Sequence, residues 1–143
     1  MRMLIVIPGD PIPKARARIF QRKKKSIAYD PQGDKKEYVR NKIKYELKIA
    51  SQRNENNISN DFLEVDMEFH MPIPVSTSKT VKEKMKLGSY HNRKPDASNM
   101  YKFYEDCANG VLYQDDSQIV KGSFKKIYSE NPRTIININS INV

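Results

Sequence analysis

The sequence is short of the residues that several common functions require. It contains one cysteine, Cys107, which has no second cysteine with which to form a disulfide within the chain. Its two histidines, His70 and His91, lie far apart, so a histidine-based metal site or a Cys–His nucleophile has little support. No apolar run approaches the roughly 18 residues that suggest a membrane span, and residues 3–7 are too short for a signal-peptide core. We therefore expect a cytoplasmic protein with no membrane partner.

Charge is the most informative feature of the composition. The 143 residues fit one domain, 1–143, and 26 Lys and Arg residues against 17 Asp and Glu residues give a formal charge of +9. This charge favours a polyanionic partner. Nucleic acid is the commonest such partner, because each phosphate contact releases condensed counterions. A basic surface that serves solubility alone is the alternative.

Hydrophobic patterning predicts several strands and helices. The firmest strand covers residues 62–71, where apolar and polar residues alternate. We predict further strands over residues 3–7, 119–128 and 134–143, helices over residues 34–53, 77–87 and 97–109, and a loop over residues 51–61. The apolar positions of these elements are Tyr38, Ile43 or Tyr45, Leu47 and Ile49/Ala50 in the first helix, Met100, Phe103 and Cys107 in the third, and Val120, Phe124 and Ile127 in strand 119–128.

A basic segment follows the first strand and is a candidate DNA contact. In an extended arm or hairpin, Lys14, Arg16 and Arg18 project to one side and present three cations to a phosphate backbone. The segment continues with Arg22 and the three lysines at 23–25. A basic, solvated loop is the alternative. The basic face of helix 77–87 is another candidate DNA surface.

Acidic and basic residues converge in sequence between positions 94 and 118. Asn99, Lys102 and Asp106 share one face of helix 97–109, and Asp96 lies at its N-terminal end. Asp115 and Asp116 follow a tight turn and a short apolar stretch. If that stretch runs back antiparallel beside the helix, the pair returns near Asp96 and several carboxylates meet beside a lysine.

Such a cluster would repel itself unless it bound a cation, and its oxygen ligands suit Mg²⁺ or Mn²⁺. The ions would activate water for phosphodiester hydrolysis, and Lys102 could assist the phosphate or the leaving oxygen. Each residue also has a plainer interpretation. Asp96 is a natural N-cap, Lys102 and Asp106 could form an exposed ion pair, and residues 114–117 could be only a polar turn.

The order of residues in this segment resembles the signature of the RusA-type Holliday-junction resolvases. The opening of the chain and His91 also fit that family, so the resemblance covers nearly the whole sequence. The matching residues are Lys94-Pro95-Asp96, Asn99, Lys102, Asp106, Gly110 and Asp115-Asp116-Ser117-Gln118, with Pro8-Gly9-Asp10-Pro11, Pro13-Lys14-Ala15-Arg16 and Arg18 near the N-terminus.

The resemblance implies an α/β (α+β) fold: a single small domain with a mixed β-sheet flanked by helices, in a homodimer. It also implies paired cleavage of four-way DNA junctions in recombination and repair, with Mg²⁺ or Mn²⁺ bound by aspartates. Carried over by position, Asp96, Lys102 and Asp116 are catalytic, and Asp96, Asp115 and Asp116 hold the metal. Lys14, Arg16, Arg18, Arg93 and Lys94 would contact DNA, with Ser98, Asn99, Asp106 and His91 as supporting residues.

Ser98 departs from the family pattern, which commonly has an aspartate at this position. A serine hydroxyl is neutral and is a weaker metal ligand than a carboxylate, although it can hold a metal-bound water. The leading hypothesis is therefore a junction endonuclease, and the alternative is a weakened or non-catalytic protein that binds branched DNA. Binding of RNA or of an acidic protein is a third hypothesis, under which the aspartates would have no purpose.

Overall fold

The computed structural model describes residues 2–15, 18–22, 25–52 and 62–141 of the chain. Its elements follow one another in the order β1 (Arg2–Pro8), β2 (Arg18–Arg22), β3 (Lys25–Tyr29), α1 (Gly33–Gln52), β4 (Phe62–Pro72), α2 (Lys79–Lys86), α3 (Ala97–Ala108), a short 3-10 helix η1 (Asp116–Gln118), β5 (Ile119–Ser129) and β6 (Arg133–Ile141).

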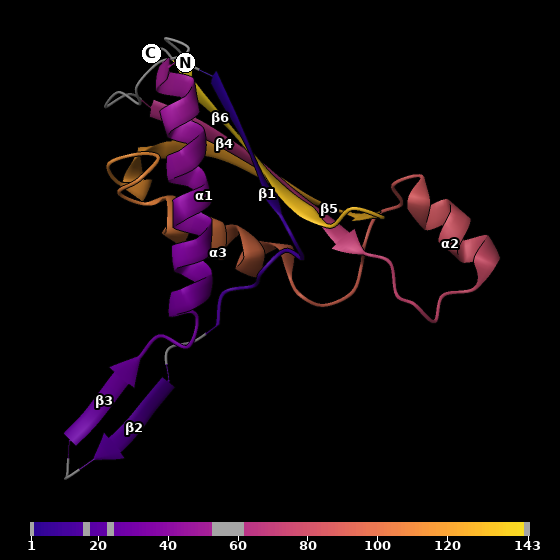
Figure 1. Cartoon of the computed structure of the whole chain (residues 1–143), viewed down its shortest axis with the longest axis horizontal. Helices are drawn as coiled ribbons and strands as arrows, with labels where there is room; N and C mark the ends of the chain where they lie inside the picture. The colour runs from indigo at the N-terminus through magenta and orange to yellow at the C-terminus, as the bar shows by residue number, and fades with distance from the viewer. Residues whose placement is uncertain (1, 16–17, 23–24, 53–61, 142–143) are drawn as a thin grey trace.

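A four-stranded mixed sheet with the strand order β1-β6-β4-β5 forms the centre of the molecule. Strands β4 and β5 run parallel, and the pairs β1–β6 and β4–β6 are antiparallel. Parallel neighbours need a crossover connection, and here it carries α2 and α3. Helices α1 and α3 lie against one face of the sheet (Figure 1). The predicted α/β (α+β) class with a mixed sheet and flanking helices is confirmed.

Alternation along β4 creates the core. Leu63, Val65, Met67 and Phe69 are buried and face the helices, as the period of two predicts. The predicted stripe of α3 meets them: its buried residues are Met100, Phe103, Tyr104, Cys107 and Ala108. Burial raises the pKa of the Cys107 thiol to about 12, so this cysteine is an inert core residue.

The other face of the sheet carries a row of paired charges. The acidic side chains of β4 stand opposite basic or hydroxyl side chains of β5. Lys125 Nζ lies 2.9 Å from Glu68 Oε1, and the Ser123 hydroxyl donates to Asp66 Oδ1. These cross-strand contacts stabilise the half-buried carboxylates of this central strand.

Strands β2 and β3 form a separate antiparallel hairpin that projects away from the sheet (Figure 1). The structure therefore confirms an arm or hairpin in this basic segment. Its base is fixed by Gln32, whose Nε2 donates to the Pro13 carbonyl at 2.7 Å and whose Oε1 accepts from Ala15 N at 2.8 Å. The Tyr104 hydroxyl accepts from Ile12 N at 3.0 Å, which ties the same segment to α3.

Two sequence expectations about core positions are wrong. In α1, Tyr38 is exposed and its neighbour Val39 is buried instead; of the alternatives Ile43 and Tyr45, Ile43 is the buried one, and Ala50 is buried as predicted. In β5, Val120 and Phe124 are also exposed. Leu63 pairs with Ile119 and Glu64 with Lys121, so Val120 is the extra residue of a β-bulge, which breaks the simple alternation.

His70 and the loop prediction also differ from expectation. His70 belongs to the polar positions of β4, yet only 7% of it is exposed. Residues 51 and 52 extend α1, and the remainder of the predicted loop, 53–61, lies outside the described residues.

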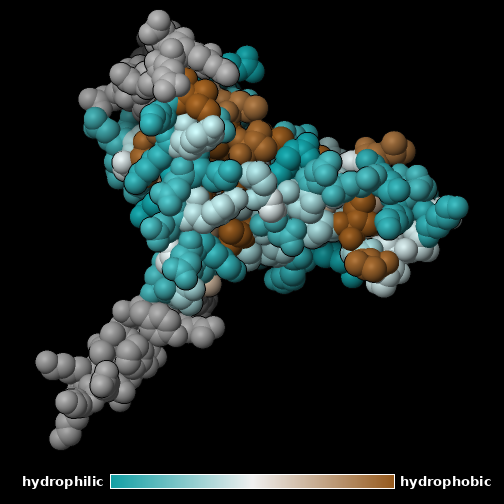
Figure 2. Space-filling view, in the orientation of Figure 1, coloured by the Kyte–Doolittle hydropathy of each residue, from teal (hydrophilic) through white to brown (hydrophobic). Residues whose placement is uncertain are grey.

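Helix α2 stands apart from the sheet at the opposite end from the hairpin (Figure 1). It has no buried residue, and it carries Lys79, Lys82, Lys84 and Lys86. Figure 2 shows apolar patches in this region, where Val75, Val81 and Leu87 are exposed. Among the described residues, no helix is long and apolar enough to cross a membrane.

Candidate active site

Asp96 occupies the N-cap position of α3 but does not act as a cap. Its backbone is extended, as an N-cap requires, yet its side chain accepts no hydrogen bond from the helix. The exposed carboxylate lies 3.3 Å from Lys94 Nζ instead. The capping interpretation therefore accounts for the backbone of Asp96 and leaves its carboxylate open to other contacts.

Asp115 and Asp116 are adjacent in sequence but differ in their roles. Asp115 caps η1: its Oδ2 accepts from Ser117 N at 3.2 Å, and Gln118 Oε1 accepts from Asp115 N at 3.1 Å in return. These hydrogen bonds, chiefly those from Ser117, lower the pKa of Asp115. Asp116 is the first residue of η1 and is exposed. The polar-turn interpretation thus fits Asp115, whereas Asp116 presents a carboxylate to the surroundings.

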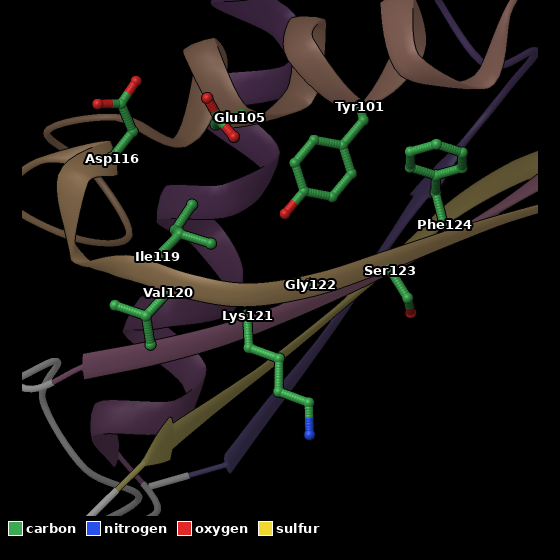
Figure 3. A pocket seen from close by; sticks show the side chains of 9 residues that line it. All are labelled: Tyr101, Glu105, Asp116, Ile119, Val120, Lys121, Gly122, Ser123 and Phe124. Atoms are coloured by element: carbon green, nitrogen blue, oxygen red, sulfur yellow. The ribbon is translucent and has the colours of Figure 1, made fainter. Parts of the chain in front are cut away.

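The carboxylate of Asp116 lies beside a residue that sequence reasoning missed, Glu105 of α3 (Figure 3). Glu105 is half-buried, and its pKa is raised, first by burial and then by the negative charges of Asp116 and Asp106. Both Glu105 and Asp116 line a groove of about 350 Å³ between α3 and β5. A cation bound beside these two carboxylates would be stabilised by both of them and would relieve the repulsion that disfavours ionised Glu105.

Within one chain, the structure does not bring Asp96 to this pair. Asp96 precedes α3, and Glu105 lies about 13 Å further along the helix axis at about 1.5 Å per residue. The stretch after α3 turns tightly, with Gly110 N donating to Tyr113 O at 2.9 Å, rather than running back along the helix. No group of three or more His, Cys, Asp or Glu side chains could hold a metal ion in the described part of the chain. The expected meeting of Asp96 with Asp115 and Asp116 is therefore not found in a single chain.

Lys102 lies on the same side of α3 as Glu105 and Ser98. Ser98, Lys102 and Glu105 stand at positions i, i+4 and i+7 of the helix, and Ser98 and Lys102 are exposed. Lys102 makes no ion pair with any described residue, so the expected alternative of a Lys102–Asp106 pair is absent. Asn99 is also exposed, and its carbonyl accepts from Lys14 N at 3.0 Å.

Asp106 has a structural role. Its Oδ2 lies 3.1 Å from Lys36 Nζ and 3.9 Å from Lys14 Nζ, and Lys36 Nζ also lies 2.6 Å from Asp30 Oδ2. This network raises the pKa of Lys36, chiefly through its hydrogen bond to Asp30. It joins α3 to both ends of the hairpin segment, so Asp106 helps to hold the basic arm in place.

His91 packs as a structural residue next to the start of α3. Its ring lies 4.8 Å from the ring of Tyr128, and burial, followed by the charge of Lys126, lowers its pKa. These contacts are those of a structural histidine that packs the loop before α3 against the sheet. Lys126 Nζ donates to the carbonyls of Arg93 and Pro95 at 2.6 and 2.8 Å, which fixes the chain that leads into Asp96.

The predicted DNA contacts are spread over two regions. Arg93 and Lys94 are exposed before α3, and Lys14 is exposed at the base of the hairpin. Arg18 begins β2, although its side chain is outside the described part of the structure, and Arg16 lies outside the described residues altogether. Sequence reasoning missed Glu105 and Lys126. Only Glu105 had a signal in the sequence, since it follows Lys102 by about one helical turn on the face that carries Ser98.

Comparisons with known proteins identify the family of this chain. The family model for the endodeoxyribonuclease RusA matches residues 8–139. A Bacillus subtilis (strain 168) protein described as uncharacterized protein YqaN is 34% identical over 138 residues, which cover 93% of this chain and 92% of the relative. The family match spans the basic arm, helix α3 with Glu105, and the aspartates Asp115 and Asp116. The resemblance seen in the sequence is thus confirmed, and the chain belongs to the RusA endodeoxyribonuclease family.

Proposed function

We propose that this protein is a divalent-metal-dependent endonuclease that binds four-way DNA junctions as a homodimer and cuts them by paired phosphodiester cleavage. The carboxylate pair of Glu105 and Asp116 is the observation that carries the proposal. It lies in a groove on a protein with a formal charge of +9 and a projecting basic hairpin. Cations at the periphery attract DNA, and an acidic pair between them needs a metal ion before a phosphate can approach.

The donor set fits Mg²⁺ or Mn²⁺. Magnesium is usually held by one or two carboxylates together with waters and substrate phosphates, so a protein cage of three acids is not required. Asp116 and Glu105 supply two carboxylates, whereas the carboxylate of Asp115 is occupied in capping η1. A bound ion would activate a water and stabilise charge on the phosphate oxygens.

The side chains around the pair have separate tasks in this proposal. Lys102, which is exposed on the same side of α3, binds the phosphate or the leaving oxygen. Lys14, Arg16, Arg18, Arg93 and Lys94 contact the DNA backbone, and the lysines of α2 extend this basic surface. Asp96 keeps its family role as a catalytic acid, at the opposite end of α3 from Asp116.

Replacement of Asp116 with asparagine tests the proposal directly. Cleavage of a synthetic four-way junction in Mg²⁺ should fall by roughly a thousandfold or more, because water activation and charge stabilisation both depend on the ion. Junction binding should stay level or rise, since the change removes a negative charge that faces a polyanion. Asp115→Asn is the matched control, and it should retain most of the activity because asparagine can still cap η1.

Two outcomes would contradict the proposal. Near-normal cleavage by Asp116→Asn would remove Asp116 from the active site. A wild-type protein that binds junctions selectively but cuts none in Mg²⁺ or Mn²⁺ would support the alternative, a non-catalytic branched-DNA-binding protein in which Ser98 replaces a family aspartate. Selective binding of RNA over junctions would contradict both functions.

The same variants reveal which subunit Asp96 serves. Co-refolding Asp96→Asn with Asp116→Asn would produce mixed dimers. If Asp96 completes the site of the partner subunit, each mixed dimer has one intact site and nicks junctions. If Asp96 serves its own chain, no mixed dimer has an intact site and nicking stays absent.

A further inference from the structure

Phe124 is a large apolar side chain that the fold leaves half-exposed to solvent. It points to the side of β5 that faces α3, and 50% of it is exposed (Figure 3). It lines both the groove that contains Glu105 and Asp116 and a neighbouring groove of about 400 Å³ with Tyr90, His91 and Lys126. An exposed aromatic residue at the junction of two grooves suggests a contact with a ligand.

Tyr101 gives this aromatic surface a fixed wall. Its ring lies 6.0 Å from that of Phe124 at a tilt of 57°, and its hydroxyl donates to the Val65 carbonyl at 3.3 Å. Gly122 makes this position possible, since a Cβ atom there would lie 2.7 Å from the Tyr101 hydroxyl. Burial, with the charges of Glu105 and Asp66, raises the pKa of Tyr101 to about 12, which keeps the hydroxyl protonated as a donor. The wall is therefore preformed.

The charges around the aromatic pair indicate what it binds. Lys125 and Lys126 line the groove on one side of Phe124, and Arg93 and Lys94 are exposed nearby in the chain that Lys126 holds. On the other side lie the carboxylates of Glu105 and Asp116. A flat aromatic ring beside exposed cations suits a nucleotide whose base has left the duplex stack, because any base can stack on a ring while Arg93 and Lys94 contact its phosphates.

A second copy of the chain fits this surface less well. A two-fold contact through Phe124 would bring Lys126 and the exposed Arg93 toward their own counterparts, and like charges would oppose the association. An apolar peptide would offer no counter-charge to Arg93.

We propose that the groove between α3 and β5 binds one unstacked base of branched DNA, with Phe124 as the stacking surface and Tyr101 as its wall. The inference rests on the proposed function in one respect, the identity of the ligand as branched DNA. It assigns a recognition role to residues outside the acidic pair. Duplex DNA keeps its bases stacked, so this contact would favour junctions over linear duplex.

The test measures binding of a four-way junction and of a linear duplex by fluorescence anisotropy in EDTA, where no cleavage occurs. Phe124→Ala should weaken junction binding by about tenfold or more and leave duplex binding unchanged, in line with the usual loss per stacked base. Phe124→Tyr, which keeps a ring, should restore junction binding. Leu4→Ala is the matched control, because Leu4 is an exposed apolar residue of β1 that lines neither groove, and it should change neither affinity.

Phe124→Leu separates stacking from packing if the alanine variant melts early. Leucine keeps an apolar side chain but lacks a ring, so the same selective loss is expected. Normal junction binding by Phe124→Leu would overturn the inference, as would an equal loss on duplex and junction, or a shift from dimer to monomer in sedimentation. Because binding is measured without metal, an inert wild-type enzyme would contradict the proposed function while leaving this result intact.

Discussion

The side chain of Gln32 is the clamp that holds the basic hairpin, and its replacement by alanine should loosen the arm without touching any DNA contact. Gln32 is 7% exposed and lies at the entrance to α1. Its side-chain amide binds the segment that follows β1: Nε2 donates to the Pro13 carbonyl at 2.7 Å, and Oε1 accepts from Ala15 N at 2.8 Å. The change deletes both bonds and leaves a carbonyl and an N–H without these partners.

The expected loss of stability follows from the two deleted bonds. Each contributes about 1 kcal/mol net, and a fully buried orphan group would cost up to about 3 kcal/mol. Ala15 is exposed and Pro13 is half-buried, so water can reach both groups. The free energy of unfolding should therefore fall by about 2 kcal/mol, the value for two lost hydrogen bonds without the cost of buried orphan groups. For a chain of this size this corresponds to a decrease in Tm of about 5 °C.

The effect on DNA binding distinguishes a clamp from a contact. Gln32→Ala should weaken junction binding at every salt concentration, because a looser arm loses more conformational freedom when it binds. The slope of log affinity against log salt should not change, since every phosphate contact remains. Urea unfolding and anisotropy over a salt series measure the two effects, with Gln114→Ala, an exposed glutamine, as the control. Unchanged stability, or a flatter salt slope, would refute the assignment of Gln32 as a clamp.

Three further predictions follow from the site. Glu105→Gln should raise Tm at neutral pH, because the raised pKa of Glu105 means that its ionised form is disfavoured in the folded state. In thermal melts this gain in Tm should vanish as the pH falls toward 4.5, the usual pKa of a glutamate, and an equal gain at pH 4 would contradict the prediction. Gly122→Ala should destabilise the fold by about 1–3 kcal/mol in urea unfolding, because its Cβ would lie 2.7 Å from both the Tyr101 hydroxyl and the Val65 carbonyl, and an unchanged midpoint would exclude that clash. Ser98→Asp should tighten binding of Mg²⁺, measured by calorimetry, and keep or increase the rate of junction cleavage, because it restores the family's carboxylate next to Asp96, where the N-terminus of α3 stabilises the added charge. A marked loss of cleavage at saturating Mg²⁺ would show that the site is built around serine.

The sequence predicted the elements well because most of them follow local rules. The predictions from the alternation in β4 and from the apolar stripe of α3 are confirmed, because each element buries one face and the sequence pattern reflects that face. The exceptions have tertiary causes. The bulge at Val120 shifts the alternation of β5, and no pattern within that strand signals it. Tyr38 and Tyr45 lie exposed because the position of α1 over the sheet, rather than its hydrophobicity, selects the buried stripe.

The sequence was less able to predict the site because the site depends on how the chain returns after α3. The separate roles of Asp115 and Asp116 depend on the cap of η1, which fixes one carboxylate and releases the other. Glu105 acquires its raised pKa only from burial and from neighbours that are remote in sequence or one position away. Neither property can be read from spacing. The basic arm was easier to predict, because seven cations over residues 14–25 without an acidic residue dictate repulsion from the core and attraction to phosphates.

The arrangement of charge explains why recognition and chemistry can be separated in this protein. Residues 14–25 and helix α2 together carry eleven of the 26 Lys and Arg residues, and the hairpin and α2 both project away from the sheet. The acidic pair lines the groove between α3 and β5, where burial and the charge of Asp116 disfavour the ionised form of Glu105. DNA held by the outer cations would therefore bring a phosphate toward carboxylates that repel it, and a divalent ion would reverse that repulsion. It follows that the salt concentration should govern binding through the outer lysines and arginines, whereas the divalent ion should govern cleavage through Glu105 and Asp116.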